Sequence, residues 1–202
     1  MKLYDSKMAP NPRRVRIFLA EKGIDVPTVQ VDIGAKANLE PGFLALNPLG
    51  RVPVLELDDG TCIAESVAIC RYFEGQQPDP ALMGVDAQDA AVVEMWQRRM
   101  EQQVLENIAG CFRNTHDFFK GRIPQVAEYG EVCRGSATER LAWLDEVLAD
   151  SEFIAGDRYT IADITAQVGI DFGRVTKIGI QPDQKNLARW HEAVSARPSA
   201  SA

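Results

Sequence analysis

The chain of 202 residues lacks the long apolar segments that membrane-spanning and secreted proteins carry. No stretch approaches the roughly 18 consecutive apolar residues that a membrane-spanning helix needs. The first ten residues, MKLYDSKMAP, contain no apolar run of the kind found in secretory signal peptides. We therefore predict a cytoplasmic protein that has no membrane as a partner.

Cysteine and histidine are scarce, with four and two residues respectively. Cys62, Cys70, Cys111 and Cys133 form no Cys-x-x-Cys pair, and no histidine lies near enough in sequence to complete a zinc site. Without a secretory signal, the expected state of these cysteines is a free thiol in a reducing compartment. The sequence therefore gives no support for a bound metal.

Positive charge is in deficit, because 22 lysine and arginine residues stand against 29 acidic ones and the net charge is −7. Such a protein does not concentrate on polyphosphates, so we expect neither nucleic acid nor an anionic membrane surface as a partner. One basic cluster, Arg13, Arg14 and Arg16, falls in a predicted helix. The simpler interpretation of this cluster is a solvated helix face.

The first third of the chain has the pattern of strand, helix and strand. Residues 2–4 begin a short strand, and residues 28–32 alternate in polarity like a second strand. Between them, Val15, Phe18 and Leu19 share one helix face at i, i+3, i+4 spacing. This βαβ unit requires a parallel pair of strands joined by a right-handed crossover.

A hairpin and a further helix follow. Residues 54–57 predict a strand, the sequence Asp-Asp-Gly at 58–60 is a hairpin turn signal, and residues 62–63 predict the returning strand. A helix is expected from residue 65 to residue 74. The N-terminal part therefore predicts a βαβ unit followed by a ββα unit.

A segment without apolar periodicity and with two prolines, residues 75–80, marks the expected domain boundary. Strand signals vanish beyond it. The predicted helices cover residues 87–120, 136–149, 161–173 and 184–196. We therefore predict an α/β domain at residues 1–78 and an all-helical domain at residues 86–202.

Two segments suggest ligand chemistry. The sequence NPLGRVPVL at residues 47–55 is a turn whose proline, Pro53, stands at the start of a strand, where its missing N–H is tolerated. In the cis state it would present the backbone of Val52 to an extended peptide ligand, whereas the simpler interpretation is an ordinary trans turn. Glu65 and Ser66 lie at a helix N-terminus, which can bind a carboxylate and, through the glutamate, an ammonium group. Both residues are also common helix caps.

These segments, NPLGRVPVL and ESVAICRYF, resemble in order and spacing the glutathione S-transferase superfamily. A third similar segment runs from Phe153 to Asp163, where Thr160 and Asp163 form the pattern of a capping box and Tyr159 with Ile164 that of a hydrophobic staple. The resemblance implies a thioredoxin-like N-terminal domain followed by a helical domain, usually in a homodimer. It spans essentially the whole chain.

The resemblance also implies a glutathione site. Pro53 would be a cis-proline, Val52 would pair its backbone with the cysteinyl part of glutathione, and Glu65 and Ser66 would hold the γ-glutamyl end. Two further residues are candidates for the glycyl end, namely Asn38 and, with weaker support, Arg51. Reduced glutathione would then be the co-substrate and a small electrophile the partner substrate. In such proteins the second substrate usually lies over the first loop, and helical-domain residues such as Phe112 and Phe119 either line its cleft or belong to the core.

The chain departs from the family where the thiol is activated. Family members that use a serine commonly read Ser-Pro-Asn before the first helix, whereas this chain reads Ala9-Pro10-Asn11. The remaining candidates are the amide of Asn11, which is also a candidate helix N-cap before Pro12, then Ser6, Tyr4 and the backbone N–H groups of the first helix. Of these, Asn11 and Ser6 are the side chains that we favour.

Three functions remain open at this point. The first is a glutathione transferase, in which the thiolate attacks an electrophile. The second is glutathione-dependent disulfide reduction, which the resemblance allows because some members of the family with an asparagine in the first loop, as in Ala9-Pro10-Asn11, work this way. The third is a binding or assembly module without catalysis, which the missing hydroxyl favours and the intact ligand-holding residues disfavour.

Overall fold

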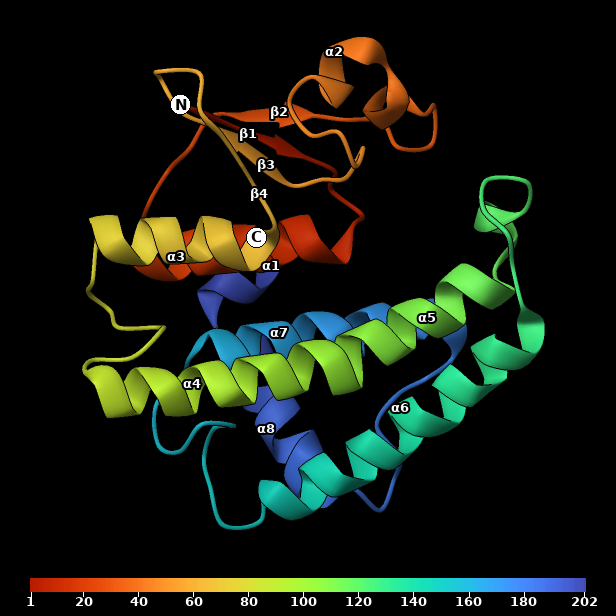
Figure 1. The fold of residues 1–202 in the computed structure, drawn as a ribbon. Coiled ribbons are helices and arrows are strands. Elements are labelled where there is room, and N and C mark those ends of the chain that lie inside the picture. The colour runs from red at the N-terminus through yellow and green to blue at the C-terminus, as the bar shows by residue number, and fades with distance from the viewer. The chain divides into compact units, whose positions relative to one another are not determined.

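A four-stranded sheet with the strand order β2-β1-β3-β4 forms the centre of the N-terminal part (Figure 1). The strands are β1 (Lys2–Asp5), β2 (Thr28–Gln30), β3 (Val54–Glu56) and β4 (Cys62–Ala64). β1 and β2 are parallel, and the pairs β1–β3 and β3–β4 are antiparallel. With α1 (Pro10–Lys22) between β1 and β2, and α3 (Ser66–Gln76) after β4, the predicted βαβ and ββα units are confirmed and form the thioredoxin-like arrangement that the family resemblance implies.

Helices cover both faces of this sheet. α1 and α3 lie side by side along one face, and α2 (Pro41–Leu44) with η1 (Ala37–Leu39) lies on the other (Figure 1). The side chains alternate accordingly, as strand geometry requires. Val54 packs with Phe43 and Tyr4 on the α2 side, whereas the neighbouring residues of the same strands, Leu3 and Leu55, are fully buried on the other side.

The computed structural model describes all 202 residues and divides into two units, residues 1–82 with 201–202 and residues 83–200. The second unit contains no named strand. Its helices are α4 (Ala87–Arg99), the π-helical segment η2 (Met100–Leu105), α5 (Glu106–Thr115), η3 (Asp117–Phe119), α6 (Ala127–Val147), α7 (Ile161–Phe172), η4 (Gly173–Thr176) and α8 (Lys185–Ser195), followed by η5 (Pro198–Ser201). The predicted helical domain is therefore present, while its predicted limits at residues 78 and 86 stay predictions. No helix in the chain combines the length and the apolar character that crossing a membrane would require.

α6 begins nine residues earlier than the sequence predicts, at Ala127 instead of residue 136. Its first turns carry exposed Tyr129 and Val132 together with Gly130, so apolar periodicity does not mark them. Gly130 is required by packing, because a Cβ atom there would lie 2.5 Å from the Thr115 side chain of α5. The first turns of α6 therefore form where the helix packs closely against α5, and they carry no amphipathic pattern.

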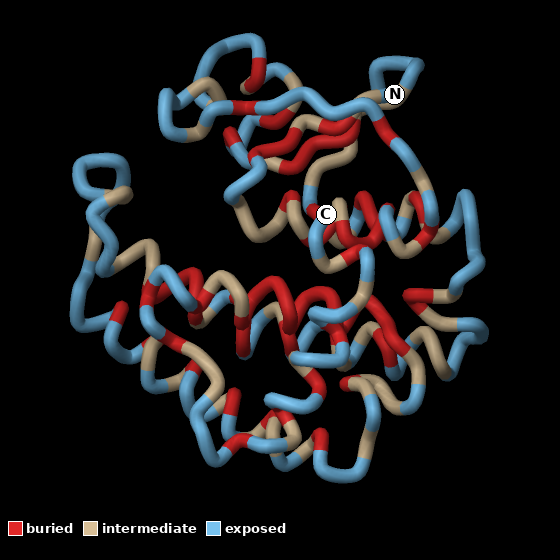
Figure 2. Tube along the Cα trace, turned by 180° about the vertical axis from the view of Figure 1, so that it is seen from behind, coloured by how far each residue is buried: buried red, intermediate tan, exposed pale blue.

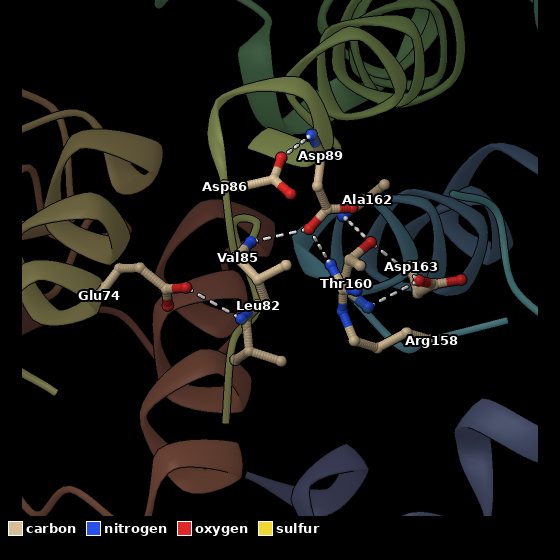
Figure 3. A network of polar contacts seen from close by, with 9 residues as sticks. All are labelled: Glu74, Leu82, Val85, Asp86, Asp89, Arg158, Thr160, Ala162 and Asp163. Carbon is tan, nitrogen blue, oxygen red and sulfur yellow. Dashed lines mark hydrogen bonds and ion pairs between the residues drawn. The ribbon is translucent and has the colours of Figure 1, made fainter. Parts of the chain in front are cut away.

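α7 is the most buried helix of the second unit, since every residue from Ile161 to Ile170 is buried (Figure 2). It starts with the predicted capping box. The Thr160 N–H donates to the Asp163 carboxylate at 2.9 Å, and the Thr160 hydroxyl accepts from the Ala162 N–H (Figure 3). The same carboxylate accepts from the Trp190 indole at 2.9 Å, so the cap also joins α7 to α8.

The segment after α3 is irregular, as predicted, but it is firmly anchored within the first unit. The buried Lys22 ammonium donates to the carbonyls of Gln77 and Pro80, each at 2.8 Å, and pairs with the Glu74 carboxylate at 2.7 Å. Glu74 in turn accepts from the Leu82 N–H at 3.0 Å (Figure 3). Lys22 therefore holds the chain from residue 77 to residue 82 against the end of α1.

Candidate functional site

The strand register brings three of the predicted segments to one end of the sheet. Tyr4 pairs with Val54, and Val54 pairs with Ala64, in antiparallel ladders. The residues after β1, before β3 and after β4 therefore lie side by side. These are the first loop from Ser6, the Val52–Pro53 dipeptide, and the pair Glu65 and Ser66.

The Val52–Pro53 peptide bond is cis, in agreement with the implied family pattern and against the ordinary trans turn. The last residue pair of the β1–β3 ladder is Tyr4 with Val54, so Val52 lies beyond the ladder. Its side chain is half-buried against the Phe43 cluster. The backbone of Val52 therefore stands where a short extended peptide can continue the sheet.

The loop before this dipeptide is fixed by two asparagines. The buried Asn47 amide donates to the Arg51 carbonyl at 2.8 Å, and Asn38 donates to the Gly50 carbonyl at 2.7 Å. Gly50 has a φ of +60°, and a Cβ atom there would lie 2.9 Å from Leu39 and 3.0 Å from the Asn38 carbonyl oxygen. This position therefore requires glycine both for its backbone conformation and for space.

Of the two candidates for the glycyl end, Asn38 already uses its amide nitrogen to hold the loop, although that nitrogen carries a second hydrogen. Arg51 is exposed, and its guanidinium makes no ion pair within the chain. Arg51 is thus available to an external carboxylate, while Asn38 shapes the loop that carries Arg51.

Glu65 and Ser66 begin α3, but they do not cap it with their side chains. Glu65 occupies the N-cap position with φ 68° and ψ 117°, and its exposed side chain makes no capping hydrogen bond. A positive φ is costly for a residue with a side chain, and such strain concentrates at functional sites. The capping interpretation is therefore wrong for these two residues, and the Glu65 carboxylate stays available to a ligand.

Ser66 is buried, and its hydroxyl accepts a hydrogen bond from the Arg14 guanidinium at 2.9 Å. The interpretation of the basic cluster as a solvated face is therefore wrong for Arg14, which is fully buried between α1 and α3. Arg16 is half-buried and pairs with the buried Asp5 carboxylate at 2.6 Å. Nothing in the local sequence separates the fully buried Arg14 from the half-buried Arg13 and Arg16.

The first loop is held by Asp5. Its carboxylate accepts from Arg16 at 2.6 Å and from the Gln30 amide at 2.7 Å, and Arg16 also donates to the Lys7 carbonyl at 3.0 Å. The Ala9 N–H donates to the Ser6 carbonyl at 2.9 Å, which closes a tight turn. Ser6 is buried in this turn. The loop that leads into α1 is therefore rigidly connected to both β1 and β2.

Asn11 is not the N-cap of α1, contrary to one of the two predicted roles. The helix starts at Pro10 with Ala9 as the N-cap, so Asn11 is the second helical residue. Pro10 and Pro12 have no N–H, and the Arg13 N–H donates to the Ala9 carbonyl at 3.3 Å. In this first turn the backbone N–H of Asn11 and its amide side chain are the donors without a partner in the chain.

Tyr4 is engaged elsewhere. Its hydroxyl donates to the Glu56 carboxylate at 2.8 Å, and its ring packs edge-on against Phe43 with centroids 6.0 Å apart. This hydrogen bond is also the main cause that holds the pKa of Glu56 below its ordinary value. Tyr4 therefore belongs to the packing on the α2 side of the sheet.

In the second unit, Phe112 lies at the centre of an aromatic cluster. Its ring contacts those of His116, Phe118, Phe119 and Phe172 at centroid distances of 4.7 to 6.3 Å. Phe112, Phe118 and Phe119 are half-buried, so the cluster is neither a closed core nor a free surface. It is an apolar cluster that is partly exposed to solvent.

The acidic, histidine and cysteine side chains are the groups that could form a metal site or, for the cysteines, a reactive thiol. No group of three or more His, Cys, Asp or Glu side chains is arranged to hold a metal ion. All four cysteines are free thiols. Burial raises the pKa of the Cys70 thiol to about 12, so this thiol stays protonated at neutral pH.

Comparison with known proteins assigns the family. The sequence models described as "Glutathione S-transferase, N-terminal domain" and "Glutathione S-transferase, C-terminal domain" match residues 9–76 and 89–198. Glutathione S-transferase 2 of Saccharomyces cerevisiae is 35% identical over 206 residues, which cover 98% of this chain and 87% of the yeast protein.

Two solved structures are similar over nearly their whole length. A glutathione S-transferase domain-containing protein of Marinobacter aquaeolei VT8 has a TM-score of 0.95 at 40% identity, with 98% of this chain and 99% of that chain covered. A glutathione S-transferase of class Gtt2 from Vibrio parahaemolyticus has a TM-score of 0.85 at 40% identity, with coverage of 98% and 94%. The fold, the matched domains and the relatives agree: the chain belongs to the glutathione S-transferase family.

Proposed function

We propose that this protein is a glutathione transferase that binds reduced glutathione at the sheet end formed by the first loop, Val52–Pro53 and Glu65–Ser66. The bound thiol loses its proton to solvent. The thiolate sulfur then attacks an electrophilic carbon and forms a C–S bond, while the electron pair of the broken bond moves onto the leaving group or the activated substrate. The protein positions the reactants and stabilises the thiolate.

The strand register is the observation that carries this proposal, because it gathers groups that match the three parts of the tripeptide. The Val52 backbone would pair with the cysteinyl part. The Glu65 carboxylate would bind the γ-glutamyl ammonium, and Ser66 with the N-terminus of α3 would bind the adjacent carboxylate. Arg51 would bind the glycyl carboxylate, with Asn38 holding the loop.

Asn11 is the best supported stabiliser of the thiolate. Ala9 has no donor, the Tyr4 hydroxyl is bound to Glu56, and Ser6 is buried in the turn. The prolines on both sides of Asn11 leave its backbone N–H and its amide as the available donors of the first helical turn. Both nitrogens lie where the positive end of the α1 dipole favours an anion.

The binding part of the proposal is tested by titrating reduced glutathione into the wild type, Glu65→Gln and a control variant, Glu128→Gln. Glu128 is an exposed glutamate in the first turn of α6, in the other unit. We expect Glu65→Gln to weaken binding about tenfold or more, since a charge-assisted hydrogen bond is lost, and Glu128→Gln to leave it unchanged. Equal affinity of all three proteins would contradict the site.

Glutathione-dependent disulfide reduction is the second candidate. The feature that favours it is Ala9 at the position where a serine would stand, because a small side chain leaves room beside the sulfur for a disulfide. In this reaction the thiolate attacks one sulfur of the disulfide and the other sulfur leaves as a thiolate. Turnover of a mixed disulfide at no more than the rate of free glutathione would remove this candidate. Absence of both turnover and glutathione binding would instead favour a module without catalysis.

A homodimer is the expected assembly of a member of this family. Sedimentation equilibrium of the full chain tests it directly. A molecular mass that stays at the monomer value of 22.3 kDa at all accessible concentrations would refute the dimer.

A further inference from the structure

Arg14 is a large charged side chain with no exposed surface, whereas the other two arginines of its cluster, Arg13 and Arg16, are half-buried. Arginine is almost never fully buried unless it has a partner. Its Nη1 atom donates to the Ser66 hydroxyl oxygen at 2.9 Å in a buried hydrogen bond between α1 and α3. The arrangement places a permanent positive charge directly behind the first residue of α3.

The hydrogen bond from Arg14 determines whether the Ser66 hydroxyl donates to or accepts from a ligand at the start of α3. A serine hydroxyl has one hydrogen to donate and two lone pairs to accept with. A guanidinium has donors but no acceptor, so the Ser66 hydrogen cannot point toward Arg14. While one lone pair is bound to Arg14, the hydroxyl hydrogen is directed away from it. Ser66 therefore presents a donor at the start of α3.

We propose that Arg14 is a positioning residue that sets Ser66 as a hydrogen-bond donor and thereby selects ligands with a carboxylate at the start of α3. This inference rests on the proposed function and deepens it. The ligand class is a γ-glutamyl peptide with a free α-carboxylate, and a peptide whose α-carboxylate is a carboxamide is disfavoured. Arg14 does not touch the ligand or the reacting sulfur.

Two electrostatic features reinforce this selection. The charge of Arg14 extends beyond Ser66, because it opposes the burial that raises the pKa of Cys70, one turn further along α3. The dipole of α3 adds positive potential at the same helix end. Both favour an anion over a neutral amide, and the Ser66 hydrogen bond adds to this preference because a bond to a charged acceptor is roughly twice as strong as one to a neutral acceptor.

The test compares two probes, reduced glutathione and its analogue with the γ-glutamyl α-carboxylate converted to a carboxamide. Binding is measured by calorimetry for the wild type, Arg14→Met, Arg14→Lys, Ser66→Ala and the double variant Arg14→Met/Ser66→Ala. We expect the wild type to prefer glutathione at least tenfold. Arg14→Met should weaken glutathione about tenfold or more, and the carboxamide less than about threefold.

The double variant separates positioning from general destabilisation. If Arg14 acts through Ser66, then Arg14→Met in the Ser66→Ala background should weaken glutathione much less than it does alone. Should Arg14→Met fail to fold, Arg14→Lys keeps a charge at this position and should retain most of the preference for the carboxylate. Thermal unfolding of each variant shows which of them are folded.

The outcomes separate the two proposals. Equal losses for both probes, or additive losses in the double variant, would overturn the role of Arg14 and leave glutathione binding standing. Equal affinity of the wild type for both probes would do the same. If the wild type binds neither probe, the proposed function fails and the inference fails with it.

Discussion

Replacing Asn11 by alanine removes the only side-chain donor without a partner in the first turn of α1 while keeping its backbone N–H. A hydrogen bond to a charged group contributes about 1.5–3 kcal/mol, and one pKa unit corresponds to about 1.4 kcal/mol. We therefore expect the pKa of the bound glutathione thiol to rise by about 1–2 units in Asn11→Ala. The remaining backbone N–H and the helix dipole keep this pKa below that of free glutathione.

The assay is the pH dependence of conjugation with a small electrophile, together with the ultraviolet absorbance of the bound thiolate. Below both pKa values the variant should react about 10- to 100-fold more slowly, because the thiolate is the nucleophile. Above both pKa values it should react at least as fast as the wild type, since a more basic thiolate is a better nucleophile. A uniform loss at every pH would indicate misplacement of the substrate instead of a lost thiolate donor.

A matched control is Asn107→Ala. Asn107 lies on α5 in the other unit, where its amide donates to the Gln103 carbonyl at 2.7 Å. This variant should keep the wild-type pH profile. Identical profiles of Asn11→Ala and the wild type would refute the assignment of Asn11 and leave the backbone N–H and the helix dipole as the stabilisers.

Three further predictions concern the fold around the site. Lys22→Met removes the cation that anchors residues 77–82. It should lower the free energy of unfolding by about 3–5 kcal/mol, as for other buried ion pairs that lose a partner. Urea denaturation measures this loss, and a value below about 1 kcal/mol would contradict the role of Lys22 as an anchor. Gly50→Ala should impair glutathione binding more than Gly60→Ala, because both positions have positive φ but only Gly50 has neighbours within 3.0 Å of an added Cβ; equal effects in the two variants would show that space does not matter. Asp163→Asn should be destabilising, since it replaces a carboxylate that accepts hydrogen bonds from Ile154, Thr160 and Trp190. Burial raises the pKa of Asp163 above its value in the unfolded chain. The free energy of unfolding of the wild type, relative to that of Asp163→Asn, should therefore decrease as pH rises through the folded-state pKa. Denaturation experiments in which this difference increases with pH would contradict the raised pKa.

The sequence contains strong local signals for most of the fold. Alternation and turn residues are sufficient for the βαβ and ββα units, and Thr160 with Asp163 predicts the capping box at the residues where it occurs. The glutathione-site candidates at Val52, Pro53, Glu65 and Ser66 come from motif order. Their gathering at one sheet end follows from the strand register, which only the structure provides.

Other features could not be predicted because they depend on contacts between distant segments. The burial of Arg14 follows from its position between two helices. In the sequence it belongs to a basic cluster that is equally typical of a solvated helix face. The start of α1 at Pro10, one residue before Asn11, depends on the turn from Ser6 to Ala9. The early start of α6 follows from a glycine contact, which leaves no periodic pattern.

The most direct test of the central claim is a calorimetric titration of the full chain with reduced glutathione in two buffers of different ionisation enthalpy. The account predicts saturable binding with release of a proton at neutral pH, because the site favours the thiolate over the thiol. Binding with the same heat in both buffers would contradict thiolate stabilisation by Asn11 and the start of α1. No binding in either buffer would contradict the glutathione site itself.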